Sequence, residues 1–231
     1  MRRIVVAVDG PAGAGKSTAS RALAGRLGYA YIDTGAMYRA VGVIAHRRGV
    51  AQNDDDALAQ LVGGLRFELR DGGGLAVDGT DVSAEIRRAE AGELASRVST
   101  RPVVRERLVA LQRALGAGGG VVMEGRDIGT VVFPNAGVKL YLTADPAERA
   151  RRRAVELRGR GESVDEAALA REIAARDERD SARSHSPLRP AADARRLDTT
   201  GLTLEQVVAR MEQEVLACLA DPQCEEALRY C

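Results

Sequence analysis

The nine residues GPAGAGKST (10–18) constrain the fold of this chain more than any other stretch. They follow the β-branched run RIVVAV (3–8), which predicts a buried strand. They run into STASRALAGRL (17–27), whose apolar spacing predicts a helix. The stretch matches G-x-x-x-x-G-K-[ST] in full, in the strand-to-helix context that this motif requires. We therefore expect an α/β protein whose first strand–loop–helix unit binds phosphate.

The chemistry of this motif explains its residue types. Glycines let backbone N–H groups turn inward around an anion, and the helix N-terminus adds its own donors. Lys16 supplies a cation for the outer phosphates, and the Ser17 hydroxyl can reach Mg²⁺. Of the 34 basic residues only Lys16 and Lys139 are lysine, so a lysine is stronger evidence here than an arginine. We expect a nucleoside triphosphate with Mg²⁺ to be held by Gly10, Pro11, Ala12, Gly13, Ala14, Gly15, Lys16, Ser17 and Thr18.

The rest of the chain alternates strand and helix patterns, which predicts parallel βαβ units. Further core strands are expected at 29–32, 121–125, 138–142 and 194–199. Further helices are expected at 36–48, from Asp145-Pro146, and after Thr203, and Thr34 is a candidate N-cap of the first of these. The interval 63–88 differs, because it alternates with period two around DGGG and predicts a small antiparallel hairpin.

Composition bounds the class of protein and its partners. A length of 231 residues suits one sizeable core or a core with a small insert. A net charge of +1 and 3% aromatic residues argue against a nucleic-acid partner. No apolar run is long enough for a membrane span or a signal peptide, so we expect a cytoplasmic protein. We also expect a monomer, because the sequence has no heptad pattern that would indicate association. The three cysteines lie in the last 14 residues, and their odd number predicts reduced thiols.

The predicted third core strand narrows the reaction class. It ends in VVMEGRD (121–127), which places Glu124, Arg126 and Asp127 at the carboxyl end of the sheet, where ligands bind in open α/β folds. An arginine beside two carboxylates suits a site for a transferring phosphoryl group and a hydrated metal ion. The Asn-Lys-x-Asp motif of switch GTPases is absent. These features favour a small-molecule kinase.

Seven stretches, in order along residues 4–215, resemble bacterial cytidylate kinases. They are DGPAGAGKST (9–18), DTGAMYR (33–39), DVSAEIR (81–87), ASRVSTRPVVRERL (95–108), EGRDIGTVVFP (124–134), RDERDSAR (176–183) and SPLRPAADA (186–194). The resemblance implies transfer of the ATP γ-phosphoryl group, with Mg²⁺, to CMP or dCMP, giving CDP or dCDP. It also implies a P-loop kinase fold, with a five-stranded parallel sheet in the order 2-3-1-4-5 flanked by helices.

The resemblance further implies a division of the chain. The P-loop core would comprise 1–59 and 99–220, with a short lid near 149–163. A small antiparallel insert at 60–98 would bind the nucleoside monophosphate. The tail 221–231 matches nothing in the family, and its role is unassigned.

The resemblance also implies roles for individual residues. Lys16, Arg126 and Asp127 would be catalytic, and Ser17 would contact Mg²⁺. The acceptor CMP would be held by Thr34, Arg39, Ser96, Arg105, Arg126, Asp127, Arg176, Asp180 and Arg183. Among these, Arg39, Arg126 and Arg183 would bind its phosphate, and Thr34 stands where the family often has serine.

Elementary chemistry agrees with these roles. An acceptor phosphate is already anionic, so no general base has to remove a proton. The difficulty is to bring two anions together, and arginines address it by bidentate pairing. Arg176, Asp180 and Arg183 have the spacing of one helix face, although a solvated ladder of ion pairs would have the same spacing.

Two alternatives to a cytidylate kinase are considered. A P-loop kinase of another small acceptor, such as shikimate or a coenzyme precursor, would not need the 63–98 insert or the 176–183 arginines. A nucleotide-binding regulatory module without catalysis would not need Lys16, Ser17, Arg39 and Arg126 all intact.

Overall fold

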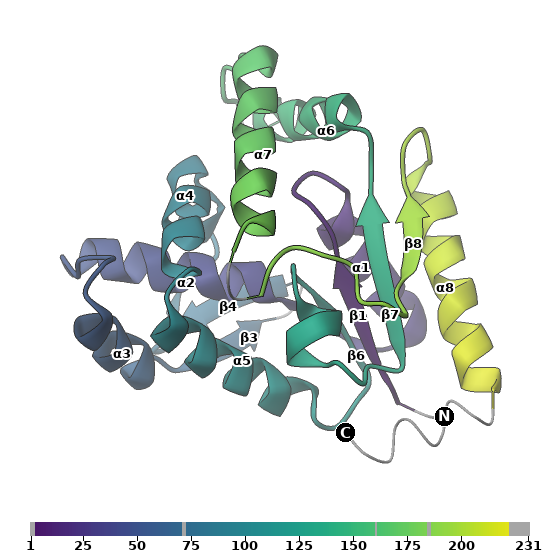
Figure 1. Cartoon of the computed structure of the whole chain (residues 1–231), viewed down its shortest axis with the longest axis horizontal. Coiled ribbons are helices and arrows are strands. Elements are labelled where there is room, and N and C mark those ends of the chain that lie inside the picture. The colour runs from purple at the N-terminus through teal and green to yellow at the C-terminus, as the bar shows by residue number, and fades with distance from the viewer. Residues whose placement is uncertain (1–2, 71–72, 160, 184–185, 222–231) are drawn as a thin grey trace. The chain divides into compact units, whose positions relative to one another are not determined.

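The computed structural model describes residues 3–70, 73–159, 161–183 and 186–221. They fall into two compact units, one made of the chain up to Ala30 and from Gly118 onward, and one made of Tyr31–Ala117. A five-stranded parallel sheet has the strand order β2-β6-β1-β7-β8, which confirms the predicted order 2-3-1-4-5 (Figure 1). Its strands are β1 (Val5–Asp9), β2 (Ala30–Asp33), β6 (Val121–Glu124), β7 (Val138–Thr143) and β8 (Arg195–Asp198).

The first unit surrounds β1, whose five residues VVAVD are all buried. This pattern is expected of a central strand in a parallel sheet, because helices cover both faces of such a sheet. Strand β1 pairs in parallel with β6 on one side and with β7 on the other, and β8 extends the sheet beyond β7. The helices of this unit are α1 (Lys16–Leu27), α6 (Pro146–Arg158), α7 (Glu166–Ser181) and α8 (Leu204–Ala220).

Local signals fix where two of these helices begin. The Asp145 carboxylate accepts a hydrogen bond from the N–H of Ala147 at 2.8 Å, and Pro146 is the first residue of α6, as predicted. Thr203 and Gln206 form a capping box at the start of α8, which confirms the predicted cap. Helix α8 packs on α1, and α6 packs on α7 through Ala154, Leu157, Leu169 and Ile173, among other residues.

The second unit contains α2 (Thr34–Arg47), α3 (Asp55–Gly64), α4 (Ala89–Val98), α5 (Pro102–Gly116) and a short 3-10 helix, Glu85–Arg87. Its antiparallel sheet has the order β3-β4-β5, with bounds Phe67–Arg70, Gly74–Val77 and Thr80–Asp81. The predicted hairpin is therefore confirmed, with one additional short strand. Met37, Val41 and Ile44 of α2 lie in the core of this unit, as their helical spacing predicted.

The predicted cap of α2 is wrong. The helix begins at Thr34, and the cap is Asp33, whose carboxylate accepts a hydrogen bond from the N–H of Ala36 at 2.9 Å. Asp33 has extended backbone dihedral angles (φ −89°, ψ 96°), which suit an N-cap, whereas Thr34 is already helical and buried.

The expectation of three reduced cysteines is also wrong, because Cys218 is disulfide-bonded. An odd number of cysteines excludes pairing of all three, but it does not exclude pairing of two. Cys224, Cys231 and nearly all of the predicted tail lie outside the described residues.

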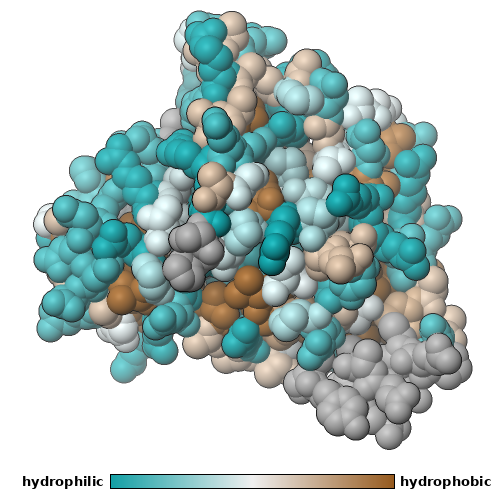
Figure 2. All heavy atoms as spheres, in the orientation of Figure 1, coloured by the Kyte–Doolittle hydropathy of each residue, from teal (hydrophilic) through white to brown (hydrophobic). Residues whose placement is uncertain are grey.

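Hydrophilic residues cover most of the face shown in Figure 2, and hydrophobic residues form separate patches on it. The large hydrophobic side chains that are exposed in the described part of the chain are Leu69, Val155, Leu204 and Leu216. Within residues 3–221, apart from the undescribed positions, we find no helix with the length and apolarity needed to cross a bilayer.

Close packing of α2 on α4 generates the first prediction. A Cβ atom on Gly42 would lie 2.8 Å from the Leu94 carbonyl carbon and 3.0 Å from the Ala95 nitrogen. Gly42→Ala should therefore lower the free energy of unfolding by about 1–3 kcal/mol, because overpacking outweighs the roughly 1 kcal/mol that alanine gains in a helix. The measurement is denaturant unfolding.

Gly63 of α3 is the matched control, because a Cβ atom there would meet nothing within 4 Å. Gly63→Ala should leave the unfolding free energy unchanged or raise it by up to about 1 kcal/mol. Equal effects at the two glycines would contradict the packing that we describe.

Candidate active site

The predicted phosphate loop lies between β1 and α1 of the first unit. Gly10, Gly13 and Gly15 have φ values of 143°, 76° and 82°, which side-chain-bearing residues rarely adopt. A Cβ atom on Gly10 would lie only 2.0 Å from the Leu142 carbonyl oxygen, so glycine is required there. Helix α1 begins at Lys16, and its first N–H groups therefore point at the loop.

Side chains hold the carbonyl oxygens of this loop. Lys16 Nζ donates to the Pro11 oxygen at 2.7 Å, and Arg149 Nη1 donates to the Ala12 oxygen at 3.0 Å. Thr199 Oγ1 lies 3.2 Å from the Ala14 oxygen. On the N–H side, the Ala12 amide donates to Asp177 Oδ1 at 3.3 Å, and Asp177 also pairs with Arg149. The Pro11, Ala12 and Ala14 oxygens therefore have partners both within the motif and far from it in sequence.

Lys16 is buried, and its electrostatic surroundings show which residues lie near it. Burial lowers the pKa of Lys16 to about 7, and the positive charges of Arg126 and, to a smaller extent, Arg176 act in the same direction. The negative charges of Glu124 and Asp9 oppose this shift. The carboxyl end of the sheet therefore gathers cations from α1, α7 and the loop after β6, as the sequence predicted for Arg126.

Asp9, the last residue of β1, was not predicted as a site residue. Its buried carboxylate accepts hydrogen bonds from the N–H groups of Ile128 and Gly129, both at 2.8 Å. It thereby fixes the start of the π-helical turn Ile128–Val132, directly after Arg126 and Asp127. Asp9 could have been predicted from the sequence, because it is a carboxylate at the end of a buried strand, immediately before the phosphate loop.

Asp180 of α7 pairs with two of the predicted arginines. Its carboxylate is 2% exposed, accepts a hydrogen bond from Arg126 Nε at 3.1 Å, and forms an ion pair with Arg183. Helix α7 ends at Ser181 and Ala182 is its C-cap, so Arg183 does not share a helix face with Arg176 and Asp180. The prediction of one helical face is wrong for Arg183, although its guanidinium still reaches Asp180.

In the second unit, Arg39 is anchored at the start of its own helix. Its Nη2 atom lies 2.8 Å from Oδ2 of Asp33, while Oδ1 of the same carboxylate caps α2. One aspartate thus fixes both the beginning of the helix and the predicted phosphate-binding arginine. No role was predicted for Asp33 from the sequence.

Thr34 is the first residue of α2, and the other predicted residues of this unit, Ser96 and Arg105, lie on α4 and α5. Buried Arg105 has its guanidinium 5.8 Å from the ring centre of Tyr38, and its Nη1 lies 3.5 Å from the Ser99 carbonyl oxygen. The Ser99 hydroxyl donates to the carbonyl oxygen of Ser96 at 2.9 Å. Arg105 and Ser96 are therefore connected through Ser99, and Ser96 is itself buried.

Comparison with known proteins decides the family. The cytidylate kinase family model matches residues 6–216. The chain belongs to the cytidylate kinase family. The cytidylate kinase of Geobacter sp. (strain M21) is 51% identical over 220 residues, which cover 94% of each protein. That of Pelotomaculum thermopropionicum is 51% identical over 216 residues, covering 92% of this chain and 96% of the relative.

Solved structures support the fold of this cytidylate kinase family member. A gluconokinase from Sinorhizobium meliloti 1021 matches with a TM-score of 0.50 at 16% identity, covering 95% of each chain. Shikimate kinase from Acinetobacter baumannii in complex with shikimate matches with a TM-score of 0.50 at 16% identity, covering 95% of this chain and 96% of that one. At such identity the likeness concerns the fold alone, and it confirms the P-loop kinase architecture.

The environment of Asp9 generates a prediction on pH. Burial raises the pKa of Asp9 from 3.8 to about 6, while the N–H groups of Gly129 and Ile128 act against this rise. The carboxyl group of Asp9 therefore binds its proton more tightly in the folded state than in the unfolded state, and at a pH between these two pKa values it is mostly protonated only in the folded state. The wild type should therefore gain stability relative to Asp9→Asn, which does not titrate, by up to about 3 kcal/mol as the pH falls from 7 to 4.

Denaturant unfolding of both proteins at several pH values measures this difference. It should be constant above about pH 7, where the Asp9 carboxyl is ionised in both folded and unfolded states. If the unfolding free energy of the wild type instead falls relative to that of Asp9→Asn as the pH is lowered, the folded protein favours the ionised carboxylate.

Proposed function

We propose that this chain transfers the γ-phosphoryl group of ATP to CMP and dCMP, giving CDP and dCDP. Membership of the cytidylate kinase family supports ATP as the donor and nucleotides as substrates. The observation that carries the proposal is the complete phosphate loop, with Lys16 on the Pro11 oxygen, in the same unit as Arg126 and Arg183, which the Asp180 carboxylate holds together. Such a concentration of positive charge suits a reaction between two phosphate groups.

The donor phosphates are assigned to the phosphate loop. Its backbone N–H groups and the first turn of α1 would bind the phosphate oxygens, and Lys16 would exchange the Pro11 carbonyl for an outer phosphate. Bound phosphates add negative charge beside Lys16, which raises its pKa and keeps it cationic during the transfer. Arg126 and Asp127 complete the catalytic set that we propose.

The residues present fit a magnesium ion held mainly by the nucleotide. Ser17 is exposed at the start of α1, where its hydroxyl is an oxygen ligand of the kind that Mg²⁺ prefers. Among the described residues, no group of three or more His, Cys, Asp or Glu side chains is arranged to hold a metal ion. Bound there, Mg²⁺ would neutralise charge on the donor phosphates.

The residues proposed to bind the acceptor are assigned within each unit by itself. In the first unit we assign the CMP phosphate to Arg126 and Arg183, and we assign the nucleoside to Arg176 and Asp180. In the second unit we assign the phosphate to Arg39, and the cytosine to Thr34, Ser96 and Arg105. Asp180 also holds Arg126 and Arg183 in place, so that two guanidinium groups are positioned by one buried carboxylate.

The proposal extends to two segments and to the setting of the protein. We propose that 60–98 forms the monophosphate-binding insert and that 149–163 acts as the lid. The monomeric state, the cytoplasmic location and the lack of nucleic-acid and membrane partners stay predictions from the sequence. A kinase of another small acceptor is not favoured, because relatives named cytidylate kinase are 51% identical along most of the chain. Intact catalytic residues likewise argue against a regulatory module without catalysis.

A coupled assay of ADP release with CMP, dCMP, UMP, AMP and GMP tests the proposed function. We expect CMP and dCMP to support the fastest turnover, and we expect Lys16→Ala to lower that turnover by orders of magnitude, because it removes the cation that faces the transferring group. Turnover with AMP or GMP above that with CMP would contradict the proposal, as would near-normal rates in the Lys16 variant.

The role of Arg39 gives a second prediction. Arg39→Ala should raise KM for CMP roughly tenfold to a hundredfold, the value of a lost charge-assisted hydrogen bond, and should leave ATP binding unchanged. Arg47→Ala is the matched control, since Arg47 lies on the same helix with a side chain 52% exposed. Steady-state kinetics with each substrate varied in turn measure the effect. An equal loss of ATP affinity in the Arg39 variant would show that Arg39 does not serve the acceptor.

A further inference from the structure

We propose that Thr199 is a positioning residue for the donor phosphates. Its hydroxyl holds the carbonyl side of the phosphate loop and joins that loop to Arg152 of α6. The inference rests on the proposed function only in taking ATP as the donor. It concerns a residue that was predicted from the sequence only as the end of the core strand 194–199.

Thr199 is fixed at the edge of the large sheet. It directly follows β8, is 1% exposed, and its backbone N–H donates to the Thr143 carbonyl oxygen at 2.8 Å. Thr143 is the last residue of β7, so the position of Thr199 follows from the pairing of β7 with β8. The side chain is therefore presented to the loop by two neighbouring strands.

The hydroxyl of Thr199 has three polar neighbours. Its Oγ1 lies 2.9 Å from the Thr143 oxygen and 3.2 Å from the Ala14 oxygen, and it accepts a hydrogen bond from Arg152 Nη1 at 2.9 Å. A hydroxyl carries one hydrogen atom, and the Thr143 oxygen already receives the backbone N–H of Thr199. Donation to Ala14 therefore leaves both carbonyl oxygens with a donor.

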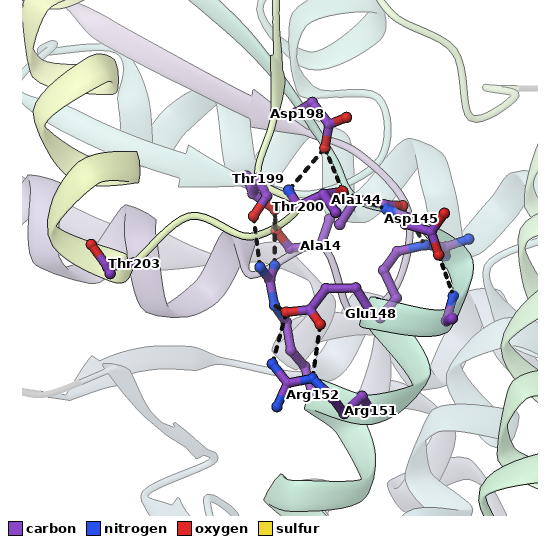
Figure 3. A network of polar contacts seen from close by, with 12 residues as sticks. Ala14, Ala144, Asp145, Glu148, Arg151, Arg152, Asp198, Thr199, Thr200 and Thr203 are labelled. Atoms are coloured by element: carbon purple, nitrogen blue, oxygen red, sulfur yellow. Dashed lines mark hydrogen bonds and ion pairs between the residues drawn. The ribbon is translucent and has the colours of Figure 1, made fainter.

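Arg152 donates two hydrogen bonds to Thr199, one to its hydroxyl and one to its carbonyl oxygen. Its Nη2 donates to the Thr199 carbonyl oxygen at 2.7 Å, and its Nε donates to Glu148 at 2.8 Å, which sets the direction of the guanidinium (Figure 3). A Cβ atom on Gly15 would lie 3.6 Å from Arg152 Nη1, so the guanidinium lies beside the last glycine of the loop. The contact thus connects α6, β8 and the phosphate loop.

The geometry of one peptide group explains why this matters for phosphate. The carbonyl of Ala14 and the N–H of Gly15 belong to the same planar, trans peptide, and they point in opposite directions. A hydrogen bond that holds the Ala14 oxygen toward Thr199 therefore aims the Gly15 N–H away from Thr199, toward the phosphate side of the loop. Loss of the hydroxyl would release this peptide and misdirect a phosphate donor.

Two substitutions and a control test the proposal. Thr199→Val keeps the shape of the side chain without its hydroxyl, and Thr199→Ser keeps the hydroxyl. Thr200→Val is the control, because the Thr200 hydroxyl lies in the same loop and accepts from the Asp145 N–H at 2.8 Å and donates to Asp198 at 2.7 Å, without contacting the phosphate loop (Figure 3).

We expect Thr199→Val to weaken ATP binding, titrated without CMP, by roughly five- to tenfold, the value of one neutral hydrogen bond. KM for ATP should rise to the same degree while KM for CMP stays constant. Thr199→Ser should restore most of the ATP affinity, and Thr200→Val should bind ATP as the wild type does.

Equal ATP affinities in the two valine variants would overturn the proposal, as would a parallel rise of KM for both substrates. Should Thr199→Val fail to fold, Arg152→Lys carries the test, because it keeps the charge and removes the two-point grip on Thr199. Unchanged ATP affinity in that variant overturns the proposal. If the ATP affinities of the wild type and the variants follow the expected order but the wild type does not phosphorylate CMP, the proposed function is wrong and the proposed role of Thr199 is supported.

Discussion

A peptide group points its carbonyl oxygen and its N–H in opposite directions, so a loop that binds phosphate through N–H groups must hold its oxygens elsewhere. In this chain the oxygens of Ala12 and Ala14 are held by Arg149 and Thr199, and the Pro11 oxygen accepts from Lys16 Nζ, the contact that we propose a bound phosphate replaces. These partners come from the motif itself, from α6 and from the end of β8. Elements far from the loop in sequence therefore fix the direction of two of its peptide groups, those that carry the Ala12 and Ala14 oxygens.

The carboxyl end of the large sheet provides the second requirement, which is a concentration of positive charge. Strand β1 ends at the buried Asp9, which fixes the segment after Arg126 through two backbone N–H groups. Asp180 then holds Arg126 and Arg183. Buried carboxylates thus position the arginines that would neutralise phosphate, and the cost of burying like charges together is offset by these pairs.

Much of this arrangement could be predicted from the sequence. The phosphate loop, the strand order and the helix starts at Asp145 and Thr203 follow from local patterns and from the family resemblance. The cap of α2 was missed because Asp33 and Thr34 are both good caps, and the backbone dihedral angles decide between them. Arg183 was misplaced because its spacing continues the α7 pattern beyond the C-cap, where the chain has already left the helix.

The remaining site contacts could not be predicted, because they join residues far apart along the chain. Arg149 is 137 residues from Ala12, and Thr199 is 185 residues from Ala14. No periodicity or spacing encodes such pairs, and they become visible only when the sheet order places β7 beside β1 and β8 beside β7. Their residue types gave little help, since arginine is abundant in this chain and threonine is common in loops.

The central claim is that the phosphoryl group passes directly from ATP to an acceptor that is already an ionised phosphate. The most direct measurement follows the labelled γ-phosphoryl group of ATP in the presence of CMP and Mg²⁺. The arrangement of Lys16 and Arg126 predicts that the label is recovered in the β-phosphate of CDP. Label released as inorganic phosphate, with CMP unchanged, would contradict it.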